Sequence, residues 1–210
     1  IRRPGTGALF AATAEGGANA PSAIFSTRAS RRSEPSDATV PNRSSGAVMV
    51  STGRLADELQ GRGIARTRLW TRGIDRKVFH TQGAAHPALA HLPKPILLSV
   101  GRVSVEKNLD AFLGATVPGT KVVVGDGPAL AQMQARYPDA IFLGALHGDP
   151  LASAYRAADV FVFPSLTDTF GLVVLEAMAA GTPVAGFNVP GPRDLIPGTG
   201  AGAVNDDLAT

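Results

Sequence analysis

Two short segments of this chain carry charged side chains where an apolar run is followed by an expected helix. In the first segment, Arg102 and Lys107 follow an apolar run that leads to Gly101. A guanidinium fork and an ammonium group beside the positive end of a helix suit the oxygens of a diphosphate, and Gly101 would allow a close backbone approach. The residue types leave a second reading open, in which Gly101 only ends a strand and Glu106 pairs with Arg102 at the surface.

The second segment places Asp168 in a loop and Glu176 eight residues later. Glu176 would then lie about a turn and a half inside an otherwise apolar helix. A carboxylate on an apolar face is costly unless it is paired or meets polar ligand groups, and a ribose diol offers two donors to one carboxylate. The alternative is a salt bridge between Glu176 and Arg193. The first amides of the same helix, which have no partner within it, would be available to an anion. They belong to Phe170, Gly171 and Leu172.

These segments require a frame of strands and helices to position them. Compact apolar runs bounded by Gly, Pro or charge predict strands over 47–51, 95–100, 121–124, 140–143, 159–163 and 183–187. Amphipathic or apolar segments between them predict helices over 52–61, 108–113, 128–137, 149–157 and 172–180. The alternation predicts an α/β fold with a Rossmann-like, doubly wound parallel sheet.

Composition and apolar patterning divide the chain into three parts. Residues 1–45 are rich in Ala, Ser, Arg, Pro and Gly and have no apolar period of useful length. Residues 46–93 contain one strand and one helix followed by a connector, and residues 94–210 contain the remaining strand and helix units. We expect the boundary between domains in the connector.

Together the two charged segments resemble a known family. The spacing of Gly101, Arg102, Lys107 and Asn108, and the spacing of Asp168 and Glu176 before Ala-Met-Ala-x-Gly-Thr-Pro, resemble the retaining glycosyltransferases of the GT-B fold (family 4, or group 1). The resemblance covers about residues 47–196 and implies that 94–210 is the donor-binding domain, in the C-terminal half of the enzyme.

The resemblance also implies roles for single residues. Arg102 and Lys107 would hold the donor diphosphate, Asp168 would face the hydroxyls of the donor sugar, and Glu176 would bind the ribose. Loops over 125–128 and 142–144 would surround the nucleotide, with Phe142 near the base. The donor-binding residues are therefore expected to be Gly101, Arg102, Lys107, Phe142, Asp168, Phe170, Gly171, Leu172 and Glu176, and the catalytic ones Arg102, Lys107 and Asp168.

Two features depart from the family. Asp168 stands where Glu is more frequent, and its side chain is shorter by one methylene. The acceptor-binding N-terminal domain is recognisable only in its last strand and helix, so that 1–45 is interpreted as an incomplete remnant from a truncated or frame-disturbed copy. Ser26 occupies the position at which relatives often have a histidine near the donor sugar.

The implied reaction is transfer of a hexose from a UDP- or GDP-linked sugar to a lipid or saccharide acceptor with retention. No metal or other cofactor is expected, and the acceptor would attack on the face from which the phosphate leaves. The alternative is a catalytically incompetent fragment that binds a nucleotide sugar. A GT-B epimerase or phosphorylase is a further rival, but no pyridoxal lysine can be identified.

Composition narrows the remaining classes. The absence of Cys excludes disulfides, thiolate metal sites and cysteine nucleophiles. Net charge is +3 over 1–45, +5 over 46–94 and −5 over 95–210, without the interleaved aromatics of a nucleic-acid surface. No membrane span is expected, a signal-like stretch near Arg2 is short, and a cytoplasmic location is predicted, with possible peripheral contact at the inner membrane face. His80, His86, His91 and His147 are expected to be solvated, and Trp70 to belong to the core.

Overall fold

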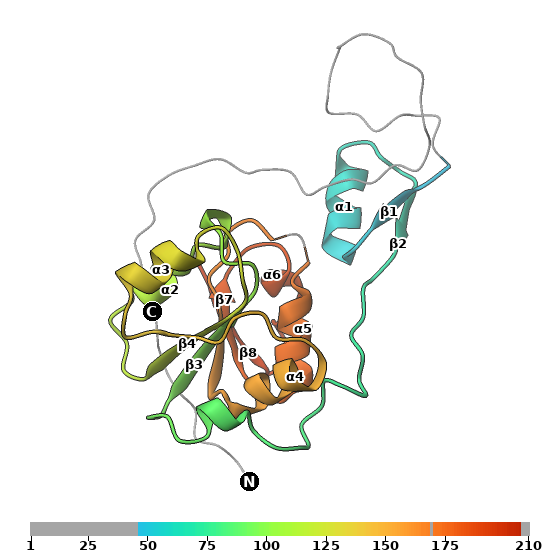
Figure 1. Cartoon of the computed structure of the whole chain (residues 1–210). Coiled ribbons are helices and arrows are strands. Elements are labelled where there is room, and N and C mark those ends of the chain that lie inside the picture. The colour runs from blue at the N-terminus through green and yellow to red at the C-terminus, as the bar shows by residue number, and fades with distance from the viewer. Residues whose placement is uncertain (1–45, 169, 207–210) are drawn as a thin grey trace. The chain divides into compact units, whose positions relative to one another are not determined.

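The computed structural model describes residues 46–168 and 170–206. Ser26 and the rest of the predicted remnant over 1–45 lie outside the described residues. Contacts between Cα atoms divide the described chain into a small unit that ends at Arg72 and a larger unit that begins at Gly73 (Figure 1). Each unit is considered by itself below.

The small unit is one parallel β-α-β element. Strand β1 (Val48–Val50) pairs in parallel with β2 (Thr67–Leu69), and helix α1 (Gly53–Gly61) connects them. The Thr52 side chain caps α1 by accepting a hydrogen bond from the backbone N–H of Leu55 at 3.2 Å. Alternation along β1 buries its two valines against Leu59 of α1.

Trp70 corrects the expectation that it belongs to the core. Its side chain is 67% exposed, directly after β2. The small unit has a helix on one face of a two-stranded sheet, and the described residues contribute no second layer within this unit. The indole directly after β2 therefore stays at the surface of the described part of this unit.

The larger unit is built on a six-stranded parallel sheet with the order β5-β4-β3-β6-β7-β8. The strands are β3 (Ile96–Val100), β4 (Thr120–Val124), β5 (Ile141–Phe142), β6 (Val160–Phe163), β7 (Val184–Phe187) and β8 (Gly202–Asn205). The helices are α2 (Leu109–Leu113), α3 (Leu130–Arg136), α4 (Gly148–Ala157), α5 (Leu172–Ala179) and α6 (Pro192–Leu195). Counted along this unit, the order is 3-2-1-4-5-6, the doubly wound arrangement that was expected.

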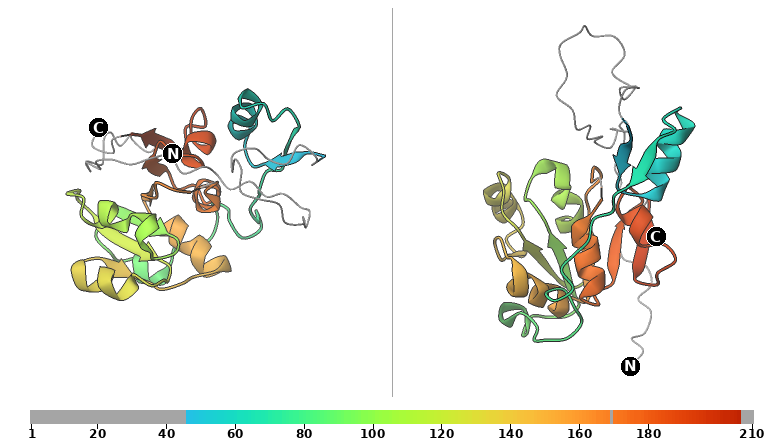
Figure 2. Two further views of the ribbon diagram at one scale, coloured as in Figure 1. Left: turned by 90° about the horizontal axis from the view of Figure 1, so that it is seen from above. Right: turned by 90° about the vertical axis from the view of Figure 1, so that its right-hand side faces the viewer.

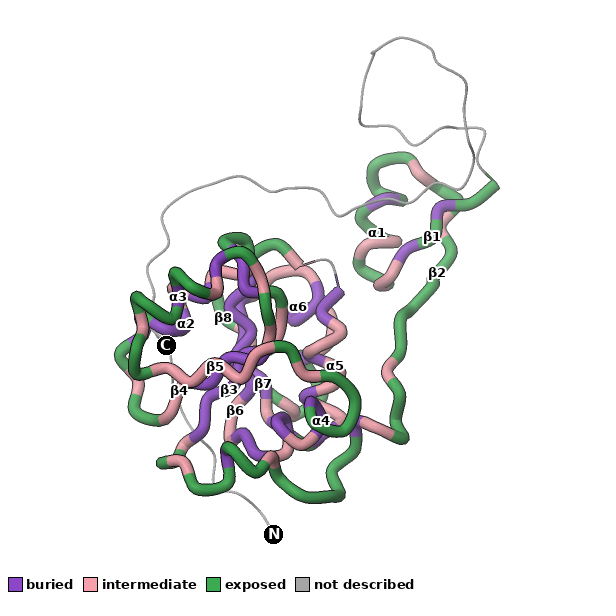
Figure 3. Tube along the Cα trace, in the orientation of Figure 1, coloured by how far each residue is buried: buried purple, intermediate pink, exposed green. Residues whose placement is uncertain are grey.

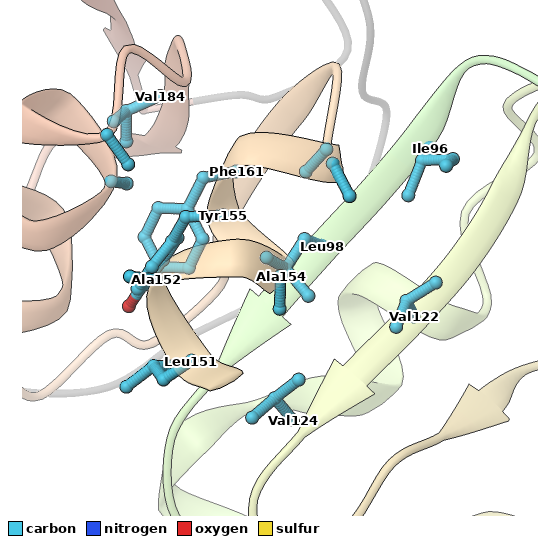
Figure 4. Packing of buried hydrophobic residues seen from close by; sticks show 14 of the residues in the cluster. Ile96, Leu98, Val122, Val124, Leu151, Ala152, Ala154, Tyr155, Phe161 and Val184 are labelled. Atoms are coloured by element: carbon cyan, nitrogen blue, oxygen red, sulfur yellow. The ribbon is translucent and has the colours of Figure 1, made fainter. Parts of the chain in front are cut away.

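The helices cover both faces of this sheet (Figures 1 and 2). Successive residues of β3 point to opposite faces, so that Leu97 packs in the cluster that includes α2 and α3. Ile96 and Leu98 pack in the other cluster, to which α4, α5 and α6 contribute (Figure 4). The central strands β3 and β6 are buried along nearly their whole length, whereas many of the connecting loops are exposed (Figure 3).

Several short elements were not predicted. Strands β2 and β8 are missing from the sequence-based assignment because neither is a compact apolar run; β8 begins with Gly and ends with Asn. Helix α6 is a single turn, and the 3₁₀ helices η1 (Pro87–Leu89) and η2 (Val105–Lys107) are shorter still. Such segments are formed by tertiary packing rather than by local propensity.

Candidate functional site

The direction of winding reverses between β3 and β6, which are neighbours in the sheet although two other strands separate them in sequence. Chain segments that leave these two strands at their carboxyl ends turn toward opposite sides of the sheet. Ligands of doubly wound folds bind outside the strands at this point. Both charged segments identified from the sequence start here, one after β3 and the other after β6.

Asn108 joins the two segments. Its backbone has the left-handed conformation, with φ 52°, between η2 and α2. Its side-chain Nδ2 donates a hydrogen bond to the carbonyl oxygen of Pro164 at 3.1 Å. Asn adopts this conformation more readily than most residues, so that one side chain sets the turn and also attaches the β3 loop to the β6 loop. The sequence analysis quoted Asn108 in the motif but assigned it no role.

Lys107 and Asp168 form an ion pair across the reversal point. Lys107 Nζ lies 2.8 Å from Asp168 Oδ2, with 30% and 20% of the two side chains exposed. Burial raises the pKa of Asp168, but the Lys107 ammonium and the N–H groups of Phe170 and Gly171 outweigh it, so that the pKa lies below its ordinary value. Asp168 is therefore ionised at neutral pH and is held in one place.

The Asp168 carboxylate also binds two of the helix amides that were expected to have no partner. Asp168 Oδ1 accepts hydrogen bonds from the backbone N–H of Phe170 at 3.3 Å and of Gly171 at 3.2 Å. Leu172 is the first residue of α5, after Gly171 in the left-handed region. The start of α5 and Lys107 thus form one positively polarised surface, and in this structure the anion bound there is the Asp168 carboxylate.

Glu176 lies one turn into α5, half-buried, and its Oε2 accepts a hydrogen bond from the Tyr155 hydroxyl at 2.9 Å. The partner is thus a tyrosine of α4, and the alternative of a salt bridge to Arg193 is wrong: the Arg193 Nε lies 3.9 Å from Asp194. Burial raises the pKa of Glu176, and the Tyr155 hydroxyl opposes this rise. The sequence analysis missed Tyr155, which looks like any core aromatic on the apolar face of an amphipathic helix.

Backbone hydrogen bonds connect the loops that follow β3, β4 and β5. The Val103 amide donates to Asp126 and the Gly125 amide to Gly144, at 2.9 and 2.8 Å. A Cβ built on Gly125 would overlap the carbonyl oxygen of Gly101, so that only glycine permits this approach. The three loops form one framework along this half of the sheet edge.

The structure therefore brings together most of the expected site residues. Gly101 and Lys107 lie on the β3 loop with Arg102, whose side chain is exposed. Phe142 ends β5, two strands away from β3, and is partly buried in the core on the side of α2 and α3.

In the described ranges, no group of three or more His, Asp or Glu side chains is arranged to hold a metal ion. Three of the four histidines are exposed, and His86 is partly buried. Among the helices of residues 46–168 and 170–206, none has the length and apolar character of a membrane-spanning segment.

The strand order and the charged groups at its reversal point define a doubly wound domain of the nucleotide-binding type. A model of the family described as glycosyl transferases group 1 matches residues 94–209. The chain belongs to this family of glycosyltransferases, and the resemblance inferred from the two motifs is confirmed.

Curated relatives match with substantial identity. A GDP-mannose-dependent alpha-mannosyltransferase of Mycobacterium tuberculosis is 40% identical over 67% of this chain. The sulfoquinovosyl transferase SQD2 of Arabidopsis thaliana is 34% identical over 75% of it. These matches span 38% and 32% of the two relatives, so that the chain corresponds to about a third of their length.

Solved structures share the fold. Sucrose-phosphate synthase of Thermosynechococcus elongatus superposes with a TM-score of 0.65 and 28% identity, over 76% of this chain and 45% of that one. Anabaena HepE in complex with UDP-glucose superposes with a TM-score of 0.61 and 21% identity, over 80% of this chain and 52% of that one. The Rossmann-like fold predicted for residues 94–210 is confirmed.

Proposed function

We propose that the larger unit binds a nucleotide diphosphate sugar at the carboxyl ends of β3 and β6, as the donor-binding part of a hexosyltransferase. The observation that carries the proposal is the Lys107–Asp168 pair at the start of α5, where a cation and helix amides already hold an anion. A phosphate oxygen has the same requirements as a carboxylate oxygen. The family to which the chain belongs supports the same reaction class.

Each charged residue then has a separate task. Arg102 and Lys107 bind the two phosphates, and their charge stabilises the diphosphate as it leaves the sugar. Glu176 accepts hydrogen bonds from the ribose hydroxyls, and Asp168 accepts them from the sugar. The Phe142 ring borders the base. The proposal includes no metal and no organic cofactor, because the positive charge that the leaving group requires comes from side chains and amides.

Retention follows if the acceptor attacks on the face from which the diphosphate departs. Asp168 is the carboxylate proposed to face the sugar, but it is held by Lys107 and two amides and is therefore a weak nucleophile. We propose that the departing phosphate guides the acceptor hydroxyl instead. Measurement of the anomeric configuration of the product by NMR tests this point, and an inverted product would refute it.

The proposals for the nucleobase and the acceptor rest on the names of similar proteins and on the charge of one segment. The mycobacterial relative is named as GDP-mannose-dependent, whereas HepE was solved with UDP-glucose, so that UDP- and GDP-linked donors are the two to test. A lipid or saccharide hydroxyl is the proposed acceptor. A lipid acceptor would suit a cytoplasmic chain that contacts the inner membrane face through the basic residues of 46–94, which carry a net charge of +5.

A second candidate function is binding without transfer. It is favoured by the roles proposed above, because Lys107, Asp168 and Glu176 are all assigned to the donor and no described residue is assigned to the acceptor. Titration of the full chain with UDP, GDP and their hexose conjugates, followed by a transfer assay with lipid and saccharide acceptors, separates the two functions. Both predict a binding isotherm, but only the transferase yields a glycosylated product.

Arg102→Ala tests the phosphate-binding role directly. Loss of one charge-assisted contact should weaken UDP or GDP by about tenfold to a hundredfold. Arg136→Ala is the matched control, because it also removes one positive charge, from the last turn of α3, where Arg136 pairs with Asp110 at 2.8 Å. Nucleotide binding that is unaffected by Arg102→Ala would refute the assignment of this residue.

A further inference from the structure

Tyr155 is a completely buried side chain that carries a polar group to the proposed ribose-binding carboxylate. Its ring packs edge-on against Phe79 and Phe161, with centroid separations of 6.1 and 5.5 Å and interplanar angles of 71° and 72°. Figure 4 shows Tyr155 beside Phe161 within the core. A ring that is confined in this way has little rotational freedom, so that its hydroxyl is a fixed hydrogen-bond donor.

The backbone of Tyr155 contacts α5 at a second point. The buried hydroxyl of Thr182, three residues after the end of α5, donates to the Tyr155 carbonyl oxygen at 2.6 Å. Residue 155 is therefore bonded both to Glu176 within α5 and to the segment that follows this helix. These two hydrogen bonds fix the position of α5, and of Glu176 within it, relative to Tyr155.

The carboxylate is left with capacity for a ligand. Tyr155 donates to Oε2 of Glu176, and in the described part of the chain no other hydrogen bond to this carboxylate is formed. One oxygen is thus oriented by the protein, and the second is available to hydroxyl donors.

We propose that Tyr155 is a positioning residue of the nucleotide site: its phenol holds the Glu176 carboxylate in the orientation that accepts hydrogen bonds from the ribose diol. The inference rests on the proposed function, because it assumes that Glu176 binds ribose. It extends that function to a residue outside both charged motifs, on a different helix.

A purely structural role is the competing explanation. A buried tyrosine hydroxyl needs an acceptor, and Glu176 would supply one whether or not a nucleotide binds. Both explanations predict that Tyr155→Phe lowers stability, because an acceptor in the protein loses its donor. Only positioning predicts a defect that depends on the ribose hydroxyls.

The pH dependence follows from the same contact. Burial raises the pKa of Glu176 and the Tyr155 hydroxyl lowers it, so that removal of the hydroxyl leaves the carboxyl with a still higher pKa. Strands β6 and β7, which pack against α5, carry no titratable side chain. The other titratable groups on the packed helices are Asp149 and Arg156 of α4, and Arg193 and Asp194 of α6. None of these four contributes to the shift of the Glu176 pKa.

The test uses the full chain with UDP and GDP, of which the tighter ligand is retained, and with the 2′-deoxy form of that ligand. Tyr155→Phe keeps the ring contacts and removes only the hydroxyl. Tyr137→Phe is the matched control, since the Tyr137 hydroxyl donates to Asp110 at 2.7 Å, on the other face of the sheet. Calorimetric titrations from pH 5 to pH 8 and thermal unfolding are measured for all three proteins.

We expect Tyr155→Phe to weaken the ribonucleotide about tenfold at neutral pH, as for the loss of a hydrogen bond to a charged group. The 2′-deoxynucleotide keeps only one of the two diol hydroxyls, so that Tyr155→Phe should weaken it clearly less than it weakens the ribonucleotide. The loss of affinity on acidification should also occur at higher pH in Tyr155→Phe, because the carboxyl with the higher pKa is protonated earlier. Tyr137→Phe should follow wild type, and the titration of the nucleotide phosphates is common to all three proteins.

Each outcome has one meaning. Equal weakening of the ribonucleotide and its deoxy form, without a shift in pH dependence, would overturn the positioning role and leave the proposed function intact. If wild type binds neither UDP nor GDP, the proposed function fails, and the positioning role fails with it. If Tyr155→Phe does not fold, Thr182→Val takes its place, because it removes the hydrogen bond that fixes the Tyr155 backbone: it should weaken the ribonucleotide more than the deoxy form, and equal weakening of the two would overturn the positioning role.

Discussion

Replacement of Asp168 by Asn should affect a nucleotide and a nucleotide sugar in opposite directions. In the structure this carboxylate occupies Lys107 and the amides of Phe170 and Gly171, which are the groups proposed to bind phosphate. Free UDP or GDP must therefore compete with Asp168 or bind beside a like charge. A hexose conjugate recovers the binding free energy that its phosphates lose to this competition, if the Asp168 carboxylate accepts hydrogen bonds from the sugar.

The magnitude follows from the geometry. At 2.8 Å and an effective dielectric constant of about 20, the Coulomb energy of the Lys107–Asp168 pair is about 6 kcal/mol. Because 30% and 20% of the two side chains are exposed, water offsets most of this energy, and hydrogen bonds to charged groups contribute about 1.5–3 kcal/mol net. Asp168→Asn should accordingly tighten free UDP or GDP by about tenfold, which is about 1.4 kcal/mol, and weaken the hexose conjugate.

The assay is isothermal titration of both ligands into wild type and Asp168→Asn. Asp159→Asn is the control, because Asp159 forms a second Lys–Asp pair, with Lys94 Nζ at 3.0 Å, before β3 and β6 rather than after them. The control should leave both affinities unchanged. If Asp168→Asn weakened the nucleotide and its conjugate equally, the carboxylate would not compete with phosphate, and the proposed arrangement would be wrong.

The remaining predictions concern stability and the framework of the site. In the folded protein the pKa of Asp168 lies below its ordinary value of 3.8. The ionised carboxylate therefore stabilises the fold above pH 3.8, and this stabilisation is lost as the pH falls through the lower pKa of the folded state. In urea unfolding between about pH 2 and 6, the free energy of unfolding of Asp168→Asn should lack this part of the pH dependence. Asn108→Ala should cost about 2–3 kcal/mol, from the left-handed backbone and a lost hydrogen bond, and Asn108→Gly less, as equilibrium unfolding will show. Gly125→Ala should abolish nucleotide binding because its Cβ overlaps Gly101, whereas Gly73→Ala, with open space around it, should bind normally in the same titration. Burial raises the pKa of Glu176, which means that its ionised form destabilises the fold above that pKa; Glu176→Gln should raise the melting temperature at pH 7 while it weakens nucleotide binding.

The sheet could be predicted because its strands are apolar on both faces. Ile96 and Leu98 face one helical layer and Leu97 the other, so that the run 95–100 shows neither polar alternation nor helical period. Strand β8 offers no such signal, since it is an edge strand whose residues are mostly exposed. It forms by parallel pairing of its backbone with β7, and this pairing cannot be recognised from the local sequence.

The sequence could indicate which charged residues lie near the reversal point of the sheet, but not the contacts that they form there. Motif spacing indicated Lys107, Asp168 and Glu176, yet the salt bridge of the first two and the hydrogen bond from Tyr155 arise from neighbours 61 and 21 positions apart. Contacts between such distant residues depend on the strand order, which brings β3 beside β6. The alternative of a salt bridge between Glu176 and Arg193 is wrong, since the fold places the Tyr155 hydroxyl beside Glu176 and leaves Arg193 beside Asp194.

The backbone framework of the loops after β3, β4 and β5 has a consequence for how such a domain changes during evolution. Hydrogen bonds among main-chain atoms connect Val103 with Asp126 and Gly125 with Gly144, so that the geometry of the three loops does not depend on most of their side chains. Substitutions that alter the preference for a base or a sugar can therefore accumulate without disturbing the turn proposed to bind phosphate. Glycines at the close approaches are the exception. A domain of this design can acquire new donors by exchanging side chains on an inherited scaffold.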